Sequence, residues 1–337
     1  MHVSEIPTPA LVIDRDAMDH NIDVMAAARP GPMLRPHVKA FKSTALARRL
    51  RDRGGHRSFC CATLREMEGM VAADLGEDLL LANETLDAAR LGRLISSSVH
   101  RLTVAIDSPE TLAVAIDAAR SGELAVLVDV NVGLPRCGCR PDQAGRLADS
   151  ARAAGLEVRG VMGYEGHVVG DPDRDRRIEA LAASMALLRA AHDDVGGEVV
   201  SSGGTGTYDL HDWANEVQAG SYLLMDWHYG RLGLPFRQAA FVDGTVVSTN
   251  DDGYAIADAG LKCFGMDHGD PTVEGYRLFF LSDEHATFLW EGERPVIGER
   301  IRLVPGHIDP TMACHERAWV TSGEEVVDTW AIDLRNW

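Results

Sequence analysis

Short runs of apolar and β-branched residues alternate with longer amphipathic stretches between about residues 33 and 230. The runs have the length of buried strands, and the stretches between them repeat their apolar positions at helical spacing. This alternation is typical of a parallel sheet covered by helices. The predicted strand segments are 33–39, 58–63, 78–83, 100–107, 123–131, 157–166, 198–202 and 216–226.

Eight such units over about 200 residues favour a (β/α)8 barrel of the TIM type, and a doubly wound open sheet is the alternative. One helix start is marked clearly, because Ser108 is a good N-cap and Pro109 fits the first helical position. The clearest helical stretches are 43–54, 64–76, 108–122, 141–156 and 174–197.

The pattern changes after about residue 240. Short strand-like runs now follow one another, separated by turns such as DG, NDDG and SGEE, with almost no helical periodicity. We therefore predict an α/β protein with two domains. The barrel is expected over residues 10–238, and an all-β domain over residues 239–337 together with 1–9.

Composition narrows the class of protein. The 337 residues include 33 Lys and Arg against 51 Asp and Glu, a formal net charge of -18. So acidic a chain lacks the basic surface that nucleic acids and anionic membranes require, and a small molecule is the expected partner. No window approaches 18 uninterrupted apolar residues and no signal-like segment is recognisable, so we expect a cytoplasmic protein with reduced thiols at its six cysteines.

Two features place candidate chemistry at the catalytic rim of the predicted barrel. Lys39 ends the first predicted strand, where a lysine is by default solvated or ion-paired. The segment 201–207, Ser-Ser-Gly-Gly-Thr-Gly-Thr, follows the seventh strand, and its glycines would let the backbone approach an anion closely. An ordinary turn is the alternative. A phosphate loop together with a rim lysine suggests pyridoxal phosphate, whose aldehyde reacts with a lysine amine.

Seven ordered segments carry a family resemblance over nearly the whole chain. They are TPALVID, LRPHVKAFKS, VDVNVGLPRCG, GYEGH, SSGGTGTY, EVQAGSYLLMDWHY and PGHIDP. Together they resemble the alanine racemase-like, fold-type III pyridoxal phosphate enzymes, and within these the D-threonine aldolase and D-serine dehydratase family. The resemblance implies a barrel, a C-terminal β domain, bound pyridoxal phosphate and a homodimer.

The resemblance also implies roles for individual residues. Lys39 would be the Schiff-base lysine, with Lys42 as the second lysine of a motif whose usual Lys-Thr-His-Lys here reads Lys39-Ala40-Phe41-Lys42. His167 would be the catalytic base, because a near-neutral imidazole is a natural acceptor for a substrate hydroxyl proton. The implied cofactor contacts are Arg136, Tyr164, Ser202, Gly203, Gly204, Thr205, Gly206, Tyr222 and Asp226.

An H-x-D pair in the β domain is the candidate metal site. His307 and Asp309 lie between Pro305 and Pro310, in what we expect to be a rigid turn. Two ligands alone are weak evidence, but in the resembling aldolases this position binds a divalent metal, and the dehydratases typically carry H-x-C. A hard carboxylate favours manganese or magnesium over zinc. A partial motif match makes His285 a candidate supporting group, and Cys137 and Cys139 are interpreted as structural.

The leading hypothesis is therefore a lyase that cleaves a β-hydroxy-D-amino acid to glycine and an aldehyde, using pyridoxal phosphate and a metal. A dehydratase of D-serine or 3-hydroxyaspartate on the same residues is the alternative. An amino-acid racemase that needs no metal and a non-catalytic pyridoxal phosphate carrier are further alternatives. The sequence does not fix the substrate side chain.

Overall fold

The computed structural model describes residues 1–97 and 99–336, which form two compact units. Unit 1 comprises residues 1–24, 40–46 and 221–335. Unit 2 comprises residues 25–39 and 47–220, with residue 336. The domain limits of 10–238 and 239–337 with 1–9 remain a prediction.

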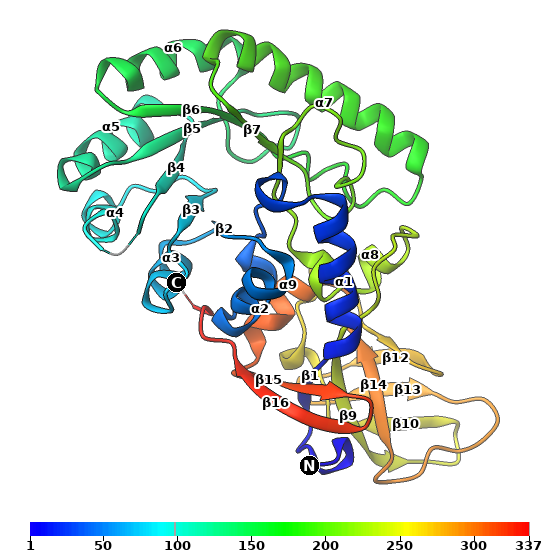
Figure 1. The fold of residues 1–337 in the computed structure, drawn as a ribbon. Coiled ribbons are helices and arrows are strands. Elements are labelled where there is room, and N and C mark those ends of the chain that lie inside the picture. Colours follow the sequence, from blue (N-terminus) through cyan, green and yellow to red (C-terminus); the bar gives the residue numbers. More distant parts are fainter. Residues whose placement is uncertain (98, 337) are drawn as a thin grey trace. The chain divides into compact units, whose positions relative to one another are not determined.

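Unit 2 is built on a parallel sheet whose strands follow one another in chain order (Figure 1). The strands are β2 (Ser58–Cys61), β3 (Asp78–Leu81), β4 (Leu102–Ile106), β5 (Ala125–Asp129), β6 (Glu157–Met162), β7 (Val199–Ser202) and β8 (Glu216–Val217). The segment 34–37 joins the two ends of this sheet, because Leu34 bridges Val217 and His37 bridges Cys60, both in parallel. This closure confirms the predicted TIM-type barrel.

The predicted strand 33–39 is reduced to these bridges, with 3-10 turns at Gly31–Met33 and Val38–Ala40 on either side. Pro36 lies in the middle of the segment and has no N–H to donate to a ladder, although its carbonyl accepts the N–H of Cys60 at 2.9 Å. The predicted strand 216–226 is also shorter than expected, since β8 ends at Val217 and a 3-10 turn forms at Ser221–Leu223.

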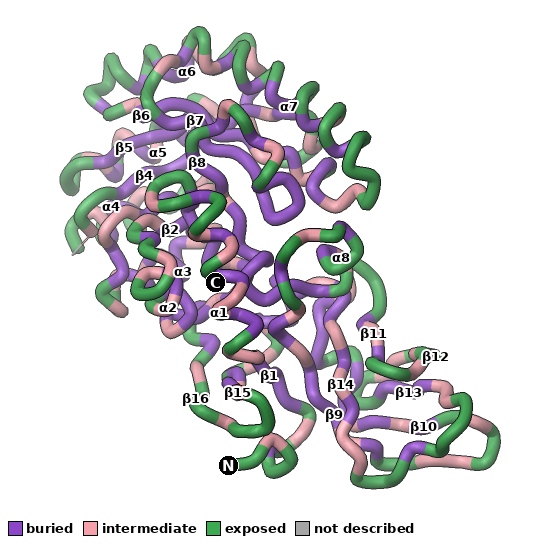
Figure 2. Tube along the Cα trace, turned by 45° about the vertical axis from the view of Figure 1, so that its right-hand side comes forward, coloured by how far each residue is buried: buried purple, intermediate pink, exposed green. Residues whose placement is uncertain are grey.

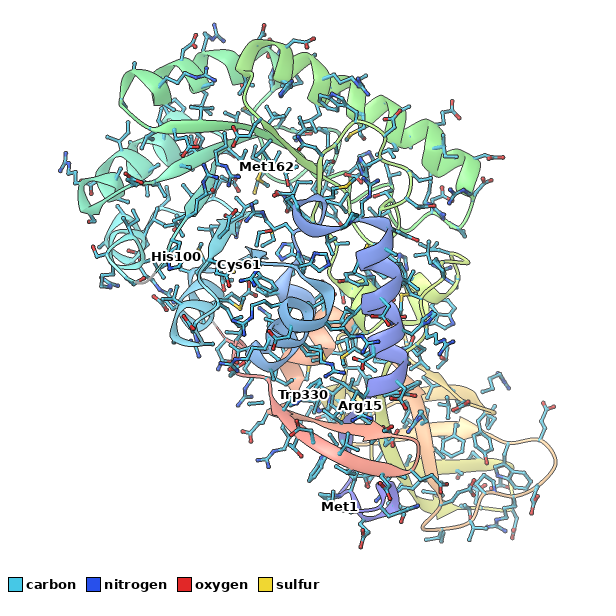
Figure 3. The ribbon with its side chains drawn as sticks, in the orientation of Figure 1. Met1, Arg15, Cys61, His100, Met162 and Trp330 are labelled. Carbon is cyan, nitrogen blue, oxygen red and sulfur yellow. The ribbon has the colours of Figure 1, made fainter. Side chains whose placement is uncertain are left out.

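The inner face of the unit 2 sheet carries one buried apolar residue from each of six strands. These residues are Cys60, Leu80, Ala105, Leu127, Met162 and Val199, of which Met162 is labelled in Figure 3. The helices lie outside the sheet, and Figure 2 shows exposed residues along α6 and α7 over buried strands. The helices of this unit include α3 (Leu64–Ala72), α4 (Ala88–Ile95), α5 (Pro109–Ala118), α6 (Pro141–Ala153) and α7 (Arg174–Val195), and α2 (Thr44–Gly54) begins in unit 1. The predicted cap is confirmed, since Ser108 Oγ accepts the Thr111 N–H at 3.3 Å.

Buried ion pairs fill the end of the barrel where the strands begin. Arg35 is only 2% exposed, and its guanidinium contacts Glu216 at 2.8 Å and Asp78 at 3.0 Å. Arg159 lies beside them and donates to Thr103 Oγ1 at 2.9 Å. A cavity of about 770 Å³ opens here, but the two buried arginines that line it are already paired with carboxylates. We therefore assign this end to stability.

Unit 1 contains a mostly antiparallel sheet in the order β12-β13-β10-β9-β1-β15-β16, with β14 on β9 and β11 on β14. Only the β1–β15 pair is parallel among the described strands of this sheet. Val242, Phe288 and Leu303 lie in its apolar core. The strands are β1 (Ala10–Asp14), β9 (Ala240–Thr249), β10 (Tyr254–Ala257), β11 (Thr272–Val273), β12 (Arg277–Leu281), β13 (Ala286–Leu289), β14 (Arg300–Val304), β15 (Arg317–Ser322) and β16 (Glu325–Ala331).

Three helices accompany this sheet: α8 (Trp227–Gly230), α9 (Ile308–Cys314) and α1 (Arg15–Ala28), whose last turn belongs to unit 2. Strand β1 brings residues 10–14 into this sheet, because it pairs with β9 and β15. Within the part of the chain that the structure describes, no helix has both the length and the apolar character needed to cross a membrane.

Candidate active site

Lys39 lies in the 3-10 turn Val38–Ala40, at the end of the barrel segment 34–37. Backbone hydrogen bonds fix the segment from both sides. The His37 N–H donates to Ala219 O at 3.1 Å, and the Cys60 N–H donates to Pro36 O at 2.9 Å. Burial raises the pKa of the Cys60 thiol, and the charges of Arg35 and Lys39 oppose that rise. The half-buried Lys39 ammonium is therefore close to the barrel interior, where the strands end.

Lys42, the second lysine of the motif, belongs to unit 1. Its backbone has a φ of 46°, and its carbonyl accepts the Leu334 N–H at 3.0 Å. The two lysines of the motif thus belong to different units.

The loops that follow β5, β6 and β7 meet at the rim of unit 2. The Arg136 guanidinium lies 5.4 Å from the centre of the Tyr164 ring, a cation–π distance. The same ring packs on Gly204, where an added Cβ would lie 3.3 Å from it. The His167 ring packs on Gly133 in the same way, 3.0 Å from the ideal Cβ position. The structure thus brings Arg136, Tyr164 and Gly204 together.

The glycine-rich loop 202–207 is a tight cradle. Gly203 has a φ of 90°, and a Cβ on it would meet the His211 ring at 2.8 Å. Ser202 donates its hydroxyl to Gly163 O at 2.7 Å, so this hydroxyl is used inside the protein. Because side-chain rings occupy the space where a Cβ would lie at Gly203 and Gly204, glycine is needed at both positions of this compact turn, and compact glycine-rich turns suit a phosphate group. On this ground the loop fits the phosphate of the implied cofactor.

An acidic pair at the strand ends escaped the sequence analysis. Asp129 ends β5 and is 6% exposed, and both carboxylate oxygens of Glu84 are buried. Burial raises the pKa of Asp129 well above its ordinary range, the neighbouring Glu84 raises it further, and Arg136 opposes the rise. The neutral form of Asp129 is therefore favoured near the predicted cofactor arginine.

Tyr222 and Asp226 belong to unit 1 and are buried. The Tyr222 ring packs against Phe236 at 5.4 Å between centres, and burial raises the pKa of its phenol, so the hydroxyl stays neutral. Asp226 is the N-cap of α8: one oxygen accepts the Tyr229 N–H and the other accepts the Ile308 N–H, both at 2.9 Å. Asp226 therefore fixes the backbone of the H-x-D segment.

His307 and Asp309 begin the short helix α9, so the expected rigid turn is a helix start with His307 as the N-cap. His307 Nδ1 lies 2.8 Å from Asp267 Oδ2, and Ser221 Oγ donates to Asp309 Oδ1 at 2.8 Å. An ionised carboxylate only accepts, so His307 Nδ1 carries the proton. The other ring nitrogen, Nε2, lies 3.9 Å from Asp309 Oδ1, and in the neutral ring its lone pair is available to a metal. Two acceptors held this close form a donor set that fits a divalent cation.

His268 is a weaker candidate ligand, although its ligand atoms, with those of Asp267 and His307, lie within 4.8 Å of one another. The His268 and His307 rings stack at 3.9 Å with 7° between their planes. Imidazole lone pairs lie in the ring plane, so those of two parallel stacked rings do not converge on one ion. His285 is exposed between β12 and β13, and all six cysteines, including Cys137 and Cys139, are free thiols.

Comparison with known proteins agrees with this arrangement. The family "Alanine racemase, N-terminal domain" matches residues 13–227, and a serine dehydratase domain matches residues 239–321. The chain belongs to the alanine racemase-like family.

Full-length relatives with assigned activities refine this placement. The D-threonine aldolase of an Arthrobacter species is 33% identical, and the 3-hydroxy-D-aspartate aldolase of Paracoccus denitrificans is 31% identical, each over 99% of this chain and 94% of its own length. The D-threo-3-hydroxyaspartate dehydratase of a Delftia species is 26% identical over 96% of this chain and 97% of its own. The crystal structure of D-threonine aldolase from Filomicrobium marinum superposes with a TM-score of 0.91 at 32% identity, covering 98% of this chain and 96% of the other.

This alanine racemase-like chain is accordingly a pyridoxal phosphate-dependent lyase of the aldolase type. The sequence analysis predicted the family and the enzyme class. It missed Glu165, Asp267 and Ser221, which hold predicted site residues through side-chain contacts. The signal for Glu165 was its place inside the GYEGH segment, whereas nothing local marks Asp267 or Ser221.

Proposed function

We propose that this enzyme cleaves a β-hydroxy-D-amino acid into glycine and an aldehyde, with pyridoxal phosphate at Lys39 and Mn²⁺ or Mg²⁺ at His307 and Asp309. The observation that carries this proposal is the geometry of the H-x-D pair. Asp267 accepts the hydrogen bond of His307 Nδ1. The other ring nitrogen, Nε2, lies near the carboxylate of Asp309, where a dehydratase typically has a thiolate. Such a donor set suits a hard divalent cation, which would bind and polarise the substrate hydroxyl.

The residues of this chain would divide the remaining work. Lys39 would hold the cofactor through its amine, and the loop 202–206 would receive its phosphate. Arg136 keeps its charge and would fix an anionic oxygen by directed hydrogen bonds, with its position set by Tyr164. The neutral phenol of Tyr222 and the carboxyl of Asp226 complete the proposed cofactor residues. When bound, pyridoxal phosphate accepts the electron pair released as the Cα–Cβ bond breaks.

His167 would take the proton from the substrate hydroxyl. It is exposed at the end of the β6 loop, and its ring is seated on Gly133, where a larger residue would displace it. An imidazole in this position can accept a proton at neutral pH and return it.

Dehydration is the second candidate, because a dehydratase relative matches nearly the whole chain. It would use the same lysine and metal: Lys39 would remove the proton from Cα, and the metal would assist departure of the hydroxyl from Cβ. The carboxylate at Asp309 favours cleavage over dehydration. The homodimer and the cytoplasmic location remain predictions from the sequence.

Product analysis tests this proposal. Purified protein with pyridoxal phosphate and Mn²⁺ is incubated with D-threonine, D-serine or D-3-hydroxyaspartate, with and without chelator. Glycine and an aldehyde that disappear on chelation would support the proposed cleavage. A keto acid and ammonia would instead identify a dehydratase. Racemisation that survives chelation would identify a racemase, and bound cofactor without turnover would identify a carrier.

A further inference from the structure

Glu165 is a completely buried carboxylate in the GYEGH segment, and the proposed mechanism does not use it. Its residue is 0% exposed, and the side chains of Glu165 and His211 are both 0% exposed in their mutual contact. Removing an ionised carboxylate from water costs several kcal/mol unless hydrogen bonds replace the lost water. Such a residue has a structural purpose, which its partners identify.

Within the described residues, the Glu165 carboxylate contacts four groups in the segment 202–211, which contains the glycine-rich loop. Oε1 accepts from Thr207 Oγ1 at 2.6 Å and contacts His211 Nε2 at 3.1 Å. Oε2 accepts from the Gly203 N–H at 3.2 Å and shares the Ser202 hydroxyl, 3.0 Å away, with Gly163 O. One oxygen therefore holds the beginning of the loop, and the other holds its end.

The contact at Thr207 also extends into the middle of the loop. Because the Thr207 hydroxyl donates to Glu165, its lone pairs remain as acceptors, and one of them receives the Gly204 N–H at 3.2 Å. The carboxylate thus orients Gly204 through one hydroxyl. Gly203 is held with a φ of 90° against the His211 ring, so this arrangement has little room to change.

The protonation state of Glu165 agrees with this geometry. Burial alone would raise its pKa, but the contacts with His211 and Thr207 outweigh burial and lower the pKa overall. Glu165 is therefore ionised at neutral pH and can only accept hydrogen bonds, so each neighbouring polar group must turn a donor toward it.

We infer that Glu165 is the positioning residue of the phosphate loop, shaping residues 203–206 to receive the phosphate of the cofactor without touching cofactor or substrate itself. This inference rests on the proposed function only in taking the loop as the phosphate site. It assigns to the centre of the GYEGH segment a role distinct from that proposed for His167.

Glu165→Gln is the direct test, because it keeps the shape of the side chain and replaces one oxygen with a donor. The new NH2 group then faces buried donors, either Ser202 and Gly203 or Thr207 and His211. We measure the Kd of the apoenzyme for pyridoxal 5'-phosphate and for pyridoxal, which lacks the phosphate. The Kd for pyridoxal 5'-phosphate should rise about 10- to 100-fold, while that for pyridoxal stays at the wild-type value. The phosphorus NMR signal of the bound cofactor should also shift.

The matched control is Glu157→Gln, at the other end of β6. Its side chain is 52% exposed and pairs with Arg101, so both dissociation constants should be unchanged. If Glu165→Gln fails to fold, the pair Thr207→Val and Thr207→Ser decides. Valine removes the hydroxyl and should weaken pyridoxal 5'-phosphate binding about 10-fold, whereas serine keeps the hydroxyl and should restore it.

Two results would overturn the inference. An unchanged preference for pyridoxal 5'-phosphate over pyridoxal in folded Glu165→Gln, or in Thr207→Val, would mean that the network serves only the fold. An equal loss of both ligands would place its effect away from the phosphate. Failure of the proposed function looks different, because the wild-type protein would then bind neither ligand or show no preference between them.

Discussion

Replacing Asp267 with asparagine should weaken metal binding about tenfold without removing a metal ligand. Both Asp267 oxygens lie within hydrogen-bond distance of His307 Nδ1, at 2.8 and 3.0 Å, and this contact fixes which ring nitrogen is left for a metal. Loss of such a supporting carboxylate typically costs 10- to 100-fold in metal affinity. Asp267 is 57% exposed, so solvent screens its charge, and asparagine can still accept one hydrogen bond. Both facts favour a loss of affinity near tenfold, which corresponds to about 1.4 kcal/mol of binding free energy.

Titration of metal-free protein with Mn²⁺, followed by electron paramagnetic resonance, measures this directly. Asp270→Asn is the matched control, because Asp270 is also exposed and lies three residues further along the same segment. His268→Ala should leave the Mn²⁺ Kd nearly unchanged, since its ring is stacked on His307 and not directed at the same point. An Asp267→Asn variant with wild-type Mn²⁺ affinity would refute this account of His307. A large loss in His268→Ala would instead make His268 a ligand.

Three further predictions concern unit 2. Arg35→Met should lower the free energy of unfolding in urea by about 3–5 kcal/mol, because it leaves the buried Glu216 without its cationic partner. Arg57→Met, which removes the exposed ion pair with Glu77, should lower the free energy of unfolding by less than about 1 kcal/mol. Equal losses in the two variants would contradict the assignment of the buried Arg35 ion pairs to stability. Lys39→Ala should remain folded but lose the visible absorption of lysine-bound cofactor; retention would exclude Lys39. Burial lowers the pKa of His56, so stability should fall as pH drops below about 6.5, and His56→Gln should flatten this dependence in unfolding titrations.

The sign of the His56 effect follows from proton binding. The unfolded state takes up a proton on this imidazole near its ordinary pKa of about 6.5, whereas the folded state resists it to lower pH. Below that pH the unfolded state therefore binds more protons, and stability rises with pH. His56 is fully buried and its Nδ1 lies 3.2 Å from Gly31 O, so a second ring proton would be buried on Nε2. A slope unchanged in His56→Gln would assign the effect to another group.

The barrel was predictable because its signals are local. The predicted segments beginning at residues 58, 78, 157 and 216 start where β2, β3, β6 and β8 start. A buried parallel strand is a short apolar run, and such a run can be recognised without knowing its neighbours. The segment 33–39 was overestimated because Pro36 removes a donor that periodicity alone does not register.

The supporting side chains were not predictable in the same way. Asp267 and His307 are 40 residues apart in the sequence, and Ser221 and Asp309 are 88 residues apart. No periodicity relates such pairs, since only the folded chain brings them together. A family motif identifies the residues expected to contact ligands, but it does not identify the acceptors and donors that hold them.

Two buried carboxylates show why that difference matters for the chemistry. Glu165 accepts donors from the phosphate loop, and Asp226 accepts the N–H of Ile308 between His307 and Asp309. Each of these buried carboxylates accepts hydrogen bonds mainly from the backbone N–H or hydroxyl groups of a functional loop. Replacing the carboxylate would therefore leave those buried donors unpaired. The loop conformation is therefore tied to the stability of its own unit. The glycines of SSGGTGT allow the phosphate loop to adopt its shape, whereas Glu165 selects that shape from the many that glycine permits.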